Sequence, residues 1–420
     1  MKIVDAGDTR AIERLLTPAG GDDRAFARRV QTIVDAVCRD GDRALARFAK
    51  RFDRVSGPIE VSAKEMRDGA AHADTKVRRA IAKAAESIAA IAVRQIPKHF
   101  DVEATPGVSV EQRIEPLARV GCYVPGGRFP LPSSLLMTVV PARVAGVREV
   151  YVVCPRPEPA VMAAALEAGV TRLFRIGGAH AIAALAYGTE TIPRVDKIVG
   201  PGNRYVAAAK ACVAADCAID FFAGPTEIVI VAGAGRPAWI AADLVAQAEH
   251  DPDARSIFIT WRRSLAARVA EAVERLATGR EIASRSLAAN GAAIVARTAA
   301  EAMAIANRFA PEHLVVDREA LVQRSIVAGA LFVGPYSAQA AGDYATGSNH
   351  VLPTAGAARF RGGLSAADFV RVMSVQRLTR EGLARVAPAI LPLARAEGLE
   401  AHARSAEWRM AGPPPRPGEK

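Results

Sequence analysis

The sequence predicts an α/β fold with two Rossmann-like βα domains and helical extensions at both ends of the chain. From about residue 108 onward, apolar runs of four to six residues end in glycine or proline and alternate with alanine-rich amphipathic stretches. Several of these runs are apolar at consecutive positions, as expected of strands that helices cover on both faces. The chain has 420 residues, half of them hydrophobic, which is more than one ordinary core needs.

The first hundred residues are expected to be helical, because apolar side chains recur at helical spacing in 26–37 and again in 77–88. From about Ser365 the chain is expected to be helical again, and the proline-rich tail 411–420 is expected to be disordered. The strands expected between these regions are Arg119–Val124, Glu149–Cys154, Arg172–Ile176, Lys197–Val199, Glu227–Ala232, Ser256–Thr260 and Ala330–Val333.

Charge and composition argue against several broad classes of protein. The formal net charge is +11, but the basic residues form no long run and only 5% of residues are aromatic, which disfavours binding of nucleic acid. No stretch reaches the roughly 18 consecutive apolar residues of a membrane span. The N-terminus lacks the apolar segment of a signal peptide. The five cysteines form no C-x-x-C pair and are expected to be buried and reduced, which fits a cytoplasmic protein.

Gln247 and His250 are candidate ligands of a metal ion. They lie three positions apart in an expected helix that ends at Asp251–Pro252, so both should face the same side of it. An amide oxygen and an imidazole nitrogen can supply two ligands of a divalent metal, and Asp343 with His402 would complete four. The alternative is that Gln247 and His250 cap the C-terminal carbonyl groups of the helix.

Glu312 and His313 are candidates for acid/base catalysis. They follow Pro311, which ends the expected helix 299–309, and they precede an expected strand at 314–316. Such junctions commonly position catalytic groups. The imidazole can take a proton from an alcohol, and a neighbouring carboxylate can orient it or activate water. The alternative is an exposed turn with two ordinary polar residues.

The polar segment 342–354 is expected to be a loop, and it contains one carboxylate, Asp343, and one imidazole, His350. Both groups could line a site. The alternative is turn chemistry, because Asp343 and Asn349 are of residue types that bond their own backbone in turns.

Four glycine-containing turns could bind a nucleotide. Gly233-x-Gly235 follows a strand and precedes a helix, as in dinucleotide-binding motifs. The next strand, however, ends in Trp261 and two arginines, which would suit NADP, instead of the acid that binds a ribose hydroxyl. Backbone N–H groups and helix N-termini could also face phosphates at the other three turns. These lie at 124–128, 176–180 and 199–205.

Seven blocks of sequence, in order along nearly the whole chain, resemble the histidinol dehydrogenase family. The blocks are Tyr123–Arg128, Lys197–Val206, Ala223–Glu227, Gln247–His250, Ala310–Leu314, Gly342–Thr354 and Glu397–His402. The resemblance implies a zinc enzyme that oxidises L-histidinol through the aldehyde to L-histidine, using two NAD in succession, in the last steps of histidine synthesis.

The resemblance also implies roles for single residues. Glu312 and His313 would be the acid/base pair, and the ligands of Zn²⁺ would be Gln247, His250, Asp343 and His402. The substrate L-histidinol would contact these four ligands, His313, and three further residues, Thr226, His350 and Glu397. In this family the C-terminal glutamate and histidine reach into the partner's site, so Glu397 and His402 imply a homodimer with shared sites.

The same resemblance places NAD on the smaller βα domain, at Tyr123, His180 and Asn203, and disfavours the Gly233 turn. His180 departs from the glutamine usual at its position. The expected main domain comprises 1–122 with 227–367, the smaller NAD-binding domain 123–226, and a helical dimerisation segment 368–410.

Two other functions are compatible with parts of the sequence. A dehydrogenase of the same fold could act on another polyol, such as a sulfonated propanediol, although Glu397 favours a substrate with an imidazole. A basic protein that binds RNA or DNA without catalysis is disfavoured by the low aromatic content.

Overall fold

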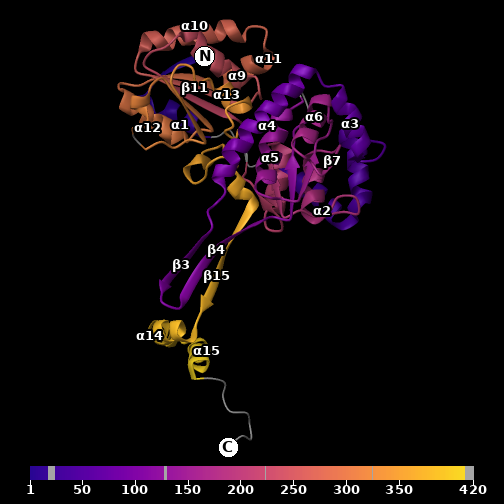
Figure 1. The fold of residues 1–420 in the computed structure, drawn as a ribbon. Coiled ribbons are helices and arrows are strands. Elements are labelled where there is room, and N and C mark those ends of the chain that lie inside the picture. The colour runs from indigo at the N-terminus through magenta and orange to yellow at the C-terminus, as the bar shows by residue number, and fades with distance from the viewer. Residues whose placement is uncertain (18–23, 127–129, 223, 324, 412–420) are drawn as a thin grey trace, which may run out of the picture. The chain divides into compact units, whose positions relative to one another are not determined.

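The computed structural model describes residues 1–17, 24–126, 130–222, 224–323 and 325–411. It divides into two compact units, the first made of 1–95 and 117–369 and the second of 96–116 and the chain from 370 onward. The described part of the first unit contains two six-stranded sheets, and that of the second contains one three-stranded sheet with two helices (Figure 1). The predicted α/β fold is therefore confirmed.

The first sheet is parallel throughout. Its strands lie in the order β1 (Lys2–Asp5), β12 (Gly291–Val295), β11 (Arg255–Thr260), β10 (Glu227–Val231), β13 (His313–Val316) and β14 (Ala330–Val333). The chain runs outward from β10 to β11 and β12 and then crosses back to β13. The strand order therefore reverses between β10 and β13.

Helices cover both faces of the first sheet. The helices of the described chain that pack around it are α1 (Thr9–Leu16), α9 (Pro237–Ala248), α10 (Arg263–Ala277), α11 (Glu281–Asn290) and α12 (Ala299–Phe309). Ile228 and Ile230 of β10 are buried in the core formed with α9, α10 and α11. Val229 and Val231 are buried in the opposite core, formed with α1 and α12. Because successive side chains point to opposite faces, this double burial explains the unbroken apolar run in β10.

The second sheet has strands in the order β2 (Glu60–Val61), β7 (Arg172–Phe174), β6 (Glu149–Val153), β5 (Arg119–Tyr123), β8 (Lys197–Val199) and β9 (Ala218–Ile219). All pairs are parallel except β2 with β7. Here the strand order reverses between β5 and β8, and ligands of open α/β sheets bind beyond the carboxyl ends of the strands at such a point.

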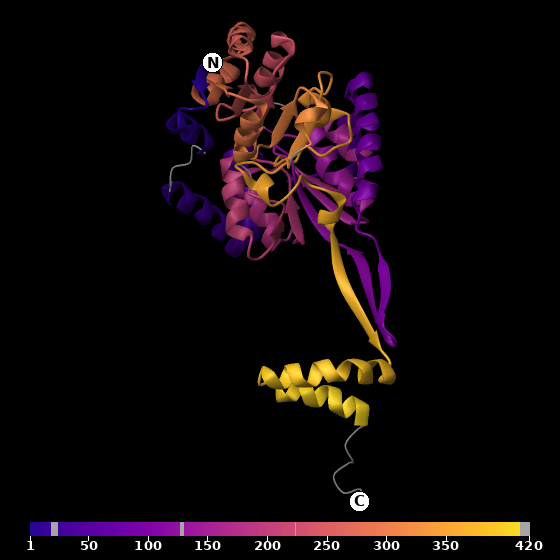
Figure 2. The same ribbon diagram turned by 90° about the vertical axis from the view of Figure 1, so that its left-hand side faces the viewer.

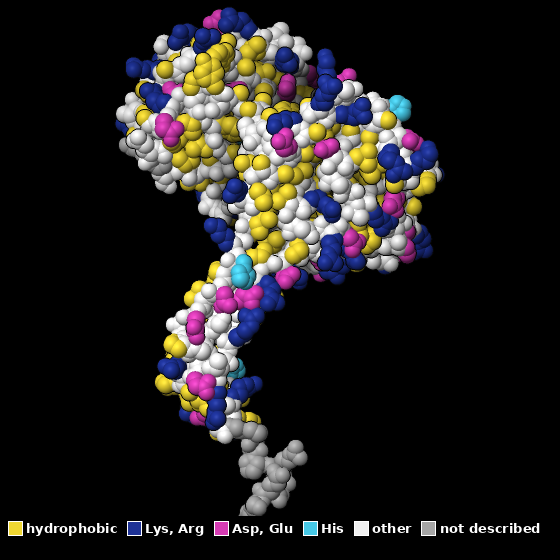
Figure 3. Space-filling view, in the orientation of Figure 1, with side chains coloured by type: hydrophobic (Ala, Val, Ile, Leu, Met, Phe, Trp, Pro, Cys, Tyr) yellow, Lys and Arg dark blue, Asp and Glu magenta, His cyan; other side chains and the backbone are white. Residues whose placement is uncertain are grey.

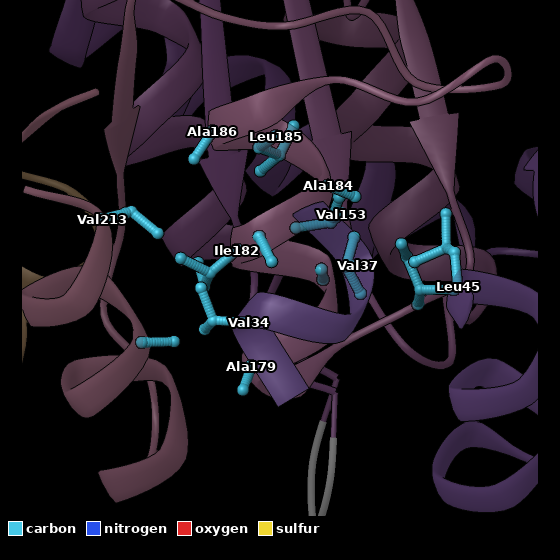
Figure 4. Packing of buried hydrophobic residues seen from close by; sticks show 14 of the residues in the cluster. Val34, Val37, Leu45, Val153, Ala179, Ile182, Ala184, Leu185, Ala186 and Val213 are labelled. Carbon is cyan, nitrogen blue, oxygen red and sulfur yellow. The ribbon is translucent and has the colours of Figure 1, made fainter. Parts of the chain in front are cut away.

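One face of the second sheet is covered by α2 (Arg24–Phe48), α7 (Gly178–Tyr187) and α8 (Arg204–Val213). Val34 and Val37 of α2 lie beside Ile182 of α7 in the buried cluster (Figure 4). The remaining helices near this sheet are α3 (Ala63–Ala71), α4 (Thr75–Gln95), α5 (Pro132–Val144) and α6 (Pro159–Glu167), with α4 against α5 and α3 against α6.

The helices of residues 24–95 and strand β5 therefore lie with the second sheet, and the expectation that all of 1–122 belongs to the domain of the first sheet does not hold for them. Strand β1 and helix α1 alone follow that expectation within this range. The physical reason is that an amphipathic helix pattern defines an apolar face but does not specify which of two sheets the face covers.

The second unit contains β3 (Phe100–Thr105), β4 (Val108–Pro116) and β15 (Val370–Leu378) in an antiparallel sheet. The helices α14 (Arg380–Ala396) and α15 (Glu400–Ala411) follow and lie side by side (Figure 2). The expectation of helix from Ser365 onward is wrong for β15, in which Val370, Val372 and Val375 favour the extended chain and pair with β4. The tail 412–420, expected to be disordered, lies outside the described residues.

Short 3-10 turns lie at Glu319–Leu321, Ala357–Arg359 and Ala366–Phe369. Of the five cysteines, three are buried as expected, Cys212 is partly buried and Cys38 is exposed; all are free thiols. In the described part of the chain, no helix is long and apolar enough to cross a membrane. On the face shown in Figure 3, basic and acidic side chains are interspersed.

We predict that Leu45→Ala lowers the free energy of unfolding by about 2–5 kcal/mol, because Leu45 is fully buried between α2 and the second sheet and its truncation leaves a cavity. The matched control is Leu166→Ala in α6, where 40% of the leucine is exposed and the loss should be below about 1 kcal/mol. Urea unfolding of both variants measures the difference, and equal losses would contradict the prediction.

Candidate active site

The candidate catalytic residues lie where β10 and β13 begin, side by side in the first sheet. The two strands pair in parallel with Ile228 opposite His313, so the residues just before them are neighbours. The Thr226 hydroxyl and the Glu227 backbone N–H both donate to Oε2 of Glu312, at 2.5 and 2.8 Å. The sheet register thus positions the Glu312 carboxyl group.

His313 is oriented by the same strand pair. Its Nδ1–H donates to the backbone carbonyl of Glu227 at 3.1 Å, which leaves Nε2 as the nitrogen able to accept a proton. Only 4% of the residue is exposed, and burial lowers the pKa of the imidazole. His313 is therefore a neutral imidazole whose Nε2 is the accepting nitrogen, as a general base must have.

Glu312 is also buried, with 7% of its surface exposed. Burial raises the pKa of its carboxyl group to about 8, against the lowering effect of the hydrogen bonds from Thr226 and Glu227. A group with a pKa near neutrality can both give and take a proton. The alternative that Glu312 and His313 form an exposed turn is wrong, because both side chains lie inside the protein.

Gln339 and Asp343 face the same site from α13 (Gln339–Tyr344), where they are four residues apart and therefore on one side of the helix. The Gln339 amide donates to Oδ2 of Asp343 at 2.6 Å, and its nitrogen lies 3.4 Å from Nε2 of His313. Oδ1 of Asp343 is 3.9 Å from the same Nε2. Gln339 is not among the residues predicted from the sequence, although its spacing of four from Asp343 is a usable signal.

Gln247 lies in the last turn of α9 and is completely buried. Its Nε2 donates to the Thr226 hydroxyl, whereas its Oε1 has no hydrogen-bond partner among the described residues. Because the amide contacts Thr226 and not the carbonyl groups of the helix end, the helix-capping alternative is wrong for Gln247. A buried acceptor without a donor is costly unless another group satisfies it.

His250 lies two residues beyond the end of α9 and is exposed, so the expectation that it shares a helix with Gln247 is wrong. It lies close enough to Asp343 to lower the pKa of that carboxyl group, although burial has the larger effect and raises it. The structure thus places His250 and Asp343 within electrostatic reach of each other, and α13 packs against α9, which carries Gln247.

His350 lies on the loop after α13. Its Nδ1–H donates to the backbone carbonyl of Asp343 at 2.9 Å, and its Nε2 lies 3.4 Å from the hydroxyl of Ser134 on α5. Burial lowers the pKa of His350 to about 4, so the imidazole is neutral at pH 7. The turn alternative holds for Asn349, whose side chain accepts from the Val351 N–H, and not for the helical Asp343.

Glu397 and His402 belong to the second unit, where Glu397 follows α14 and His402 lies in the first turn of α15. Both are exposed. Among the described residues of one chain, no three His, Cys, Asp or Glu side chains gather as they would around a metal ion.

The three residues expected to bind NAD lie beyond the carboxyl ends of strands in the second sheet. Tyr123 ends β5, His180 lies in the first turn of α7 after β7, and Asn203 precedes α8 after β8. Asn203 accepts from the N–H groups of Tyr205 and Val206 and so caps α8. His180 is only 1% exposed and bonds to Asp53 at 2.8 Å.

The competing Gly233 turn at the first sheet is already occupied by protein groups. The N–H groups of Gly233 and Ala234 both donate to Oδ2 of Asp317, at 2.8 and 3.1 Å. A side chain at Gly233 would collide with Trp261. The glycine at this position serves the packing of Trp261, and the backbone donors that would bind phosphates are used within the chain.

Comparisons with known proteins agree on one family. The family model for histidinol dehydrogenase matches residues 18–410. Histidinol dehydrogenase of Syntrophotalea carbinolica is 47% identical over 91% of this chain and 92% of its own. That of Haloarcula marismortui is 48% identical over 91% and 93%. The crystal structure of histidinol dehydrogenase from Elizabethkingia anophelis superposes with a TM-score of 0.93 at 32% identity, covering 98% of each chain.

We predict that Glu227→Gln changes the pH dependence of stability. Burial raises the pKa of Glu227 from 4.5 to about 7, so the folded state binds its proton more tightly than the unfolded state. Through this one group the wild-type protein therefore loses up to about 3 kcal/mol as the pH rises from 5 to 8, a contribution that the variant lacks. The amide oxygen introduced by the substitution can still accept from the Ala355 N–H, which donates to the Glu227 carboxylate at 2.6 Å.

Urea unfolding of both proteins at pH 5 and pH 8 measures this difference. The stability of the variant relative to the wild type should rise with pH, and a difference that stays constant would contradict the prediction.

Proposed function

The chain belongs to the histidinol dehydrogenase family, and on this premise we propose that it oxidises L-histidinol through L-histidinal to L-histidine, with one zinc ion and two NAD per turnover. Membership makes it an NAD-dependent dehydrogenase of histidine biosynthesis. One observation best supports the proposed reaction with zinc. Oε1 of Gln247 is buried and has no hydrogen-bond partner among the described residues, while the same amide donates to Thr226, which in turn donates to Glu312 beside His313.

Oxidation of an alcohol requires that the hydroxyl proton and a hydride both leave the substrate. His313 takes the proton at Nε2, because Nδ1 is committed to the Glu227 carbonyl and burial keeps the ring neutral. In the protein alone, the Gln339 amide donates a long hydrogen bond of 3.4 Å to Nε2, which the substrate hydroxyl would replace. NAD, when bound, supplies the acceptor of the hydride.

The second oxidation starts from the hydrated aldehyde and therefore needs a water molecule to be activated. Glu312 accepts from Thr226 and Glu227 through the same oxygen, Oε2, which leaves Oε1 available for that water. The raised pKa of Glu312 gives its carboxylate enough basicity to take a proton near neutral pH. The two residues thus take protons from different oxygens. His313 takes the proton of the alcohol hydroxyl, and Glu312 takes a proton of the water that adds to the aldehyde.

The residues present fit a zinc ion. Gln247 offers the unpartnered amide oxygen, Asp343 a carboxylate with one oxygen bonded to Gln339, and His250 an exposed imidazole. Together with His402 of a second subunit they would hold the ion. When bound, zinc would orient the substrate through its amine and imidazole and polarise its reacting oxygen.

A homodimer with shared sites would explain why the second unit has a small core and many exposed apolar side chains. Its buried apolar residues within 370–411 are Ala387, Ala394, Ala403 and Ala406, which is too little to stabilise a fold alone. Large apolar side chains of the same unit are exposed in one chain, namely Phe100, Val102, Val372, Met373, Leu378, Leu393, Leu399 and Trp408. We propose that a second subunit covers them and that 368–410 serves dimerisation.

We further propose that NAD binds beyond the carboxyl ends of β5 and β8, near Tyr123 and Asn203. Two observations support this position for NAD. The strand order of the second sheet reverses between β5 and β8, and the N–H groups of the Gly233 turn are already bonded to Asp317. The five free thiols fit the proposed cytoplasmic location, which is a reducing compartment.

The assay of this proposal uses purified full-length protein loaded with zinc. L-histidinol and NAD should give two NADH per histidine formed, measured by absorbance and chromatography. His313→Gln should lower kcat at least about 100-fold, because the base is lost. Removal of zinc by a chelator should abolish activity, and added zinc should restore it. A zinc-loaded protein that forms no NADH from histidinol would refute the proposal.

Mixed dimers test the shared site. His402→Ala and Glu312→Gln should each inactivate the protein, because one removes a ligand lent to the partner and the other a proton acceptor. Randomly mixed subunits should regain about one quarter of the wild-type activity, since half of the dimers are mixed and one site in each is intact. If each site used only its own chain, mixing would restore nothing. Each variant refolded alone is the control.

A further inference from the structure

A single turn of π-helix extends α2 at Ala49–Asp53 and ends at Arg54, whose φ of 61° is left-handed. Such turns are rare and occur frequently at functional sites. This one turns the side chain of Asp53 toward the start of α7, which lies more than a hundred residues later in the sequence. The reaction proposed above gives Asp53 no role.

Asp53 bonds to two groups at the start of α7 through one oxygen. Its Oδ2 accepts from the backbone N–H of Gly177 at 3.2 Å and from Nε2–H of His180 at 2.8 Å. The side chains of Asp53 and His180 are only 8% and 2% exposed. The imidazole also lies beside Phe48 and Phe52, with ring centroids 6.0 and 5.9 Å away.

The turn that Asp53 fixes is joined to the edge proposed for NAD. The N–H of Gly178 donates to the Tyr123 hydroxyl at 3.2 Å, and Tyr123 is the last residue of β5. Gly178 has a φ of +62°, and a Cβ at Gly177 would lie 2.8 Å from the Pro155 ring. Asp53, the turn 177–178 and Tyr123 therefore form one connected and closely packed assembly.

The Asp53 carboxylate also occupies the place that an anion would take at the N-terminus of α7. The N–H of Gly177 and the ring N–H of His180 are both engaged, so neither can donate to a cofactor without breaking a buried bond.

We propose that Asp53 is a positioning residue for NAD: it fixes the turn 177–178, His180 and Tyr123 in the geometry that binds the cofactor. His180 then helps to hold Asp53 and the turn in place by its hydrogen bond to Asp53, and it does not contact the cofactor itself. This inference rests on the proposed placement of NAD at the second sheet.

The test compares kinetic constants of zinc-loaded, full-length variants. Asp53→Ala removes both hydrogen bonds and should raise the KM for NAD at least about tenfold, as expected for the loss of buried bonds to a charged group. The KM for histidinol should stay within about twofold. Asp53→Asn keeps an oxygen that can accept both bonds, so its KM for NAD should stay within about threefold.

Asp317→Ala is the matched control, because Asp317 also accepts two backbone N–H groups of a glycine turn, but at the first sheet. Its KM for NAD should equal that of the wild type. If Asp53→Ala does not fold, Asp53→Glu keeps the charge but displaces the carboxylate, and should raise the KM for NAD about threefold or more.

The inference is overturned if Asp53→Ala or, where that variant does not fold, Asp53→Glu leaves the KM for NAD unchanged. It is also overturned if the substitution raises both KM values alike, or if Asp317→Ala has the same effect. These outcomes leave the proposed function standing, since they require an active enzyme. Failure of the unmodified protein to form NADH would instead refute the proposed function.

Discussion

The parallel pairing of β10 with β13 is the constraint on which the candidate active site depends. Because Ile228 lies opposite His313, the peptide groups of Glu227 face both candidate catalytic residues, with its N–H bonded to Glu312 and its carbonyl to His313. The register therefore determines the orientation of the carboxyl group and the tautomer of the imidazole together. A slip of one residue would turn both side chains to the opposite face of the sheet.

The two sheets of the first unit use opposite ends of their strands. In the first sheet Glu312 precedes β13 and His313 is its first residue, so the candidate catalytic groups lie at the amino end of the strand, in contrast to the usual position of ligands in open α/β folds. In the second sheet the proposed NAD edge follows the usual rule. At the carboxyl end of β10, Asp317 accepts the N–H groups of Gly233 and Ala234, and Trp261 packs against Gly233.

The sequence alone predicted the α/β class and most strands of the two parallel sheets, because unbroken apolar runs such as Glu227–Ala232 have few other interpretations. It did not predict β12, whose Gly291–Val295 is poor in β-branched residues, or β15, which is buried against a neighbouring strand only in part. The ordered blocks named the candidate site residues, but their contacts could not be predicted. Three contacts join elements that are distant in the sequence and meet only in the folded chain. They are those of Gln339 with His313, of Ser134 with His350 and of Asp53 with Gly177.

The occupied turn at Gly233 also has a practical consequence. Residues 234–236 are exposed and lie at the carboxyl end of β10, whereas Thr226 and Gln247 approach the site from the amino end of that strand and from the far end of α9. Exposed loop tips that contact no ligand tolerate added residues best. A fluorescent label or an immobilisation tag could therefore be inserted there without touching the candidate catalytic residues.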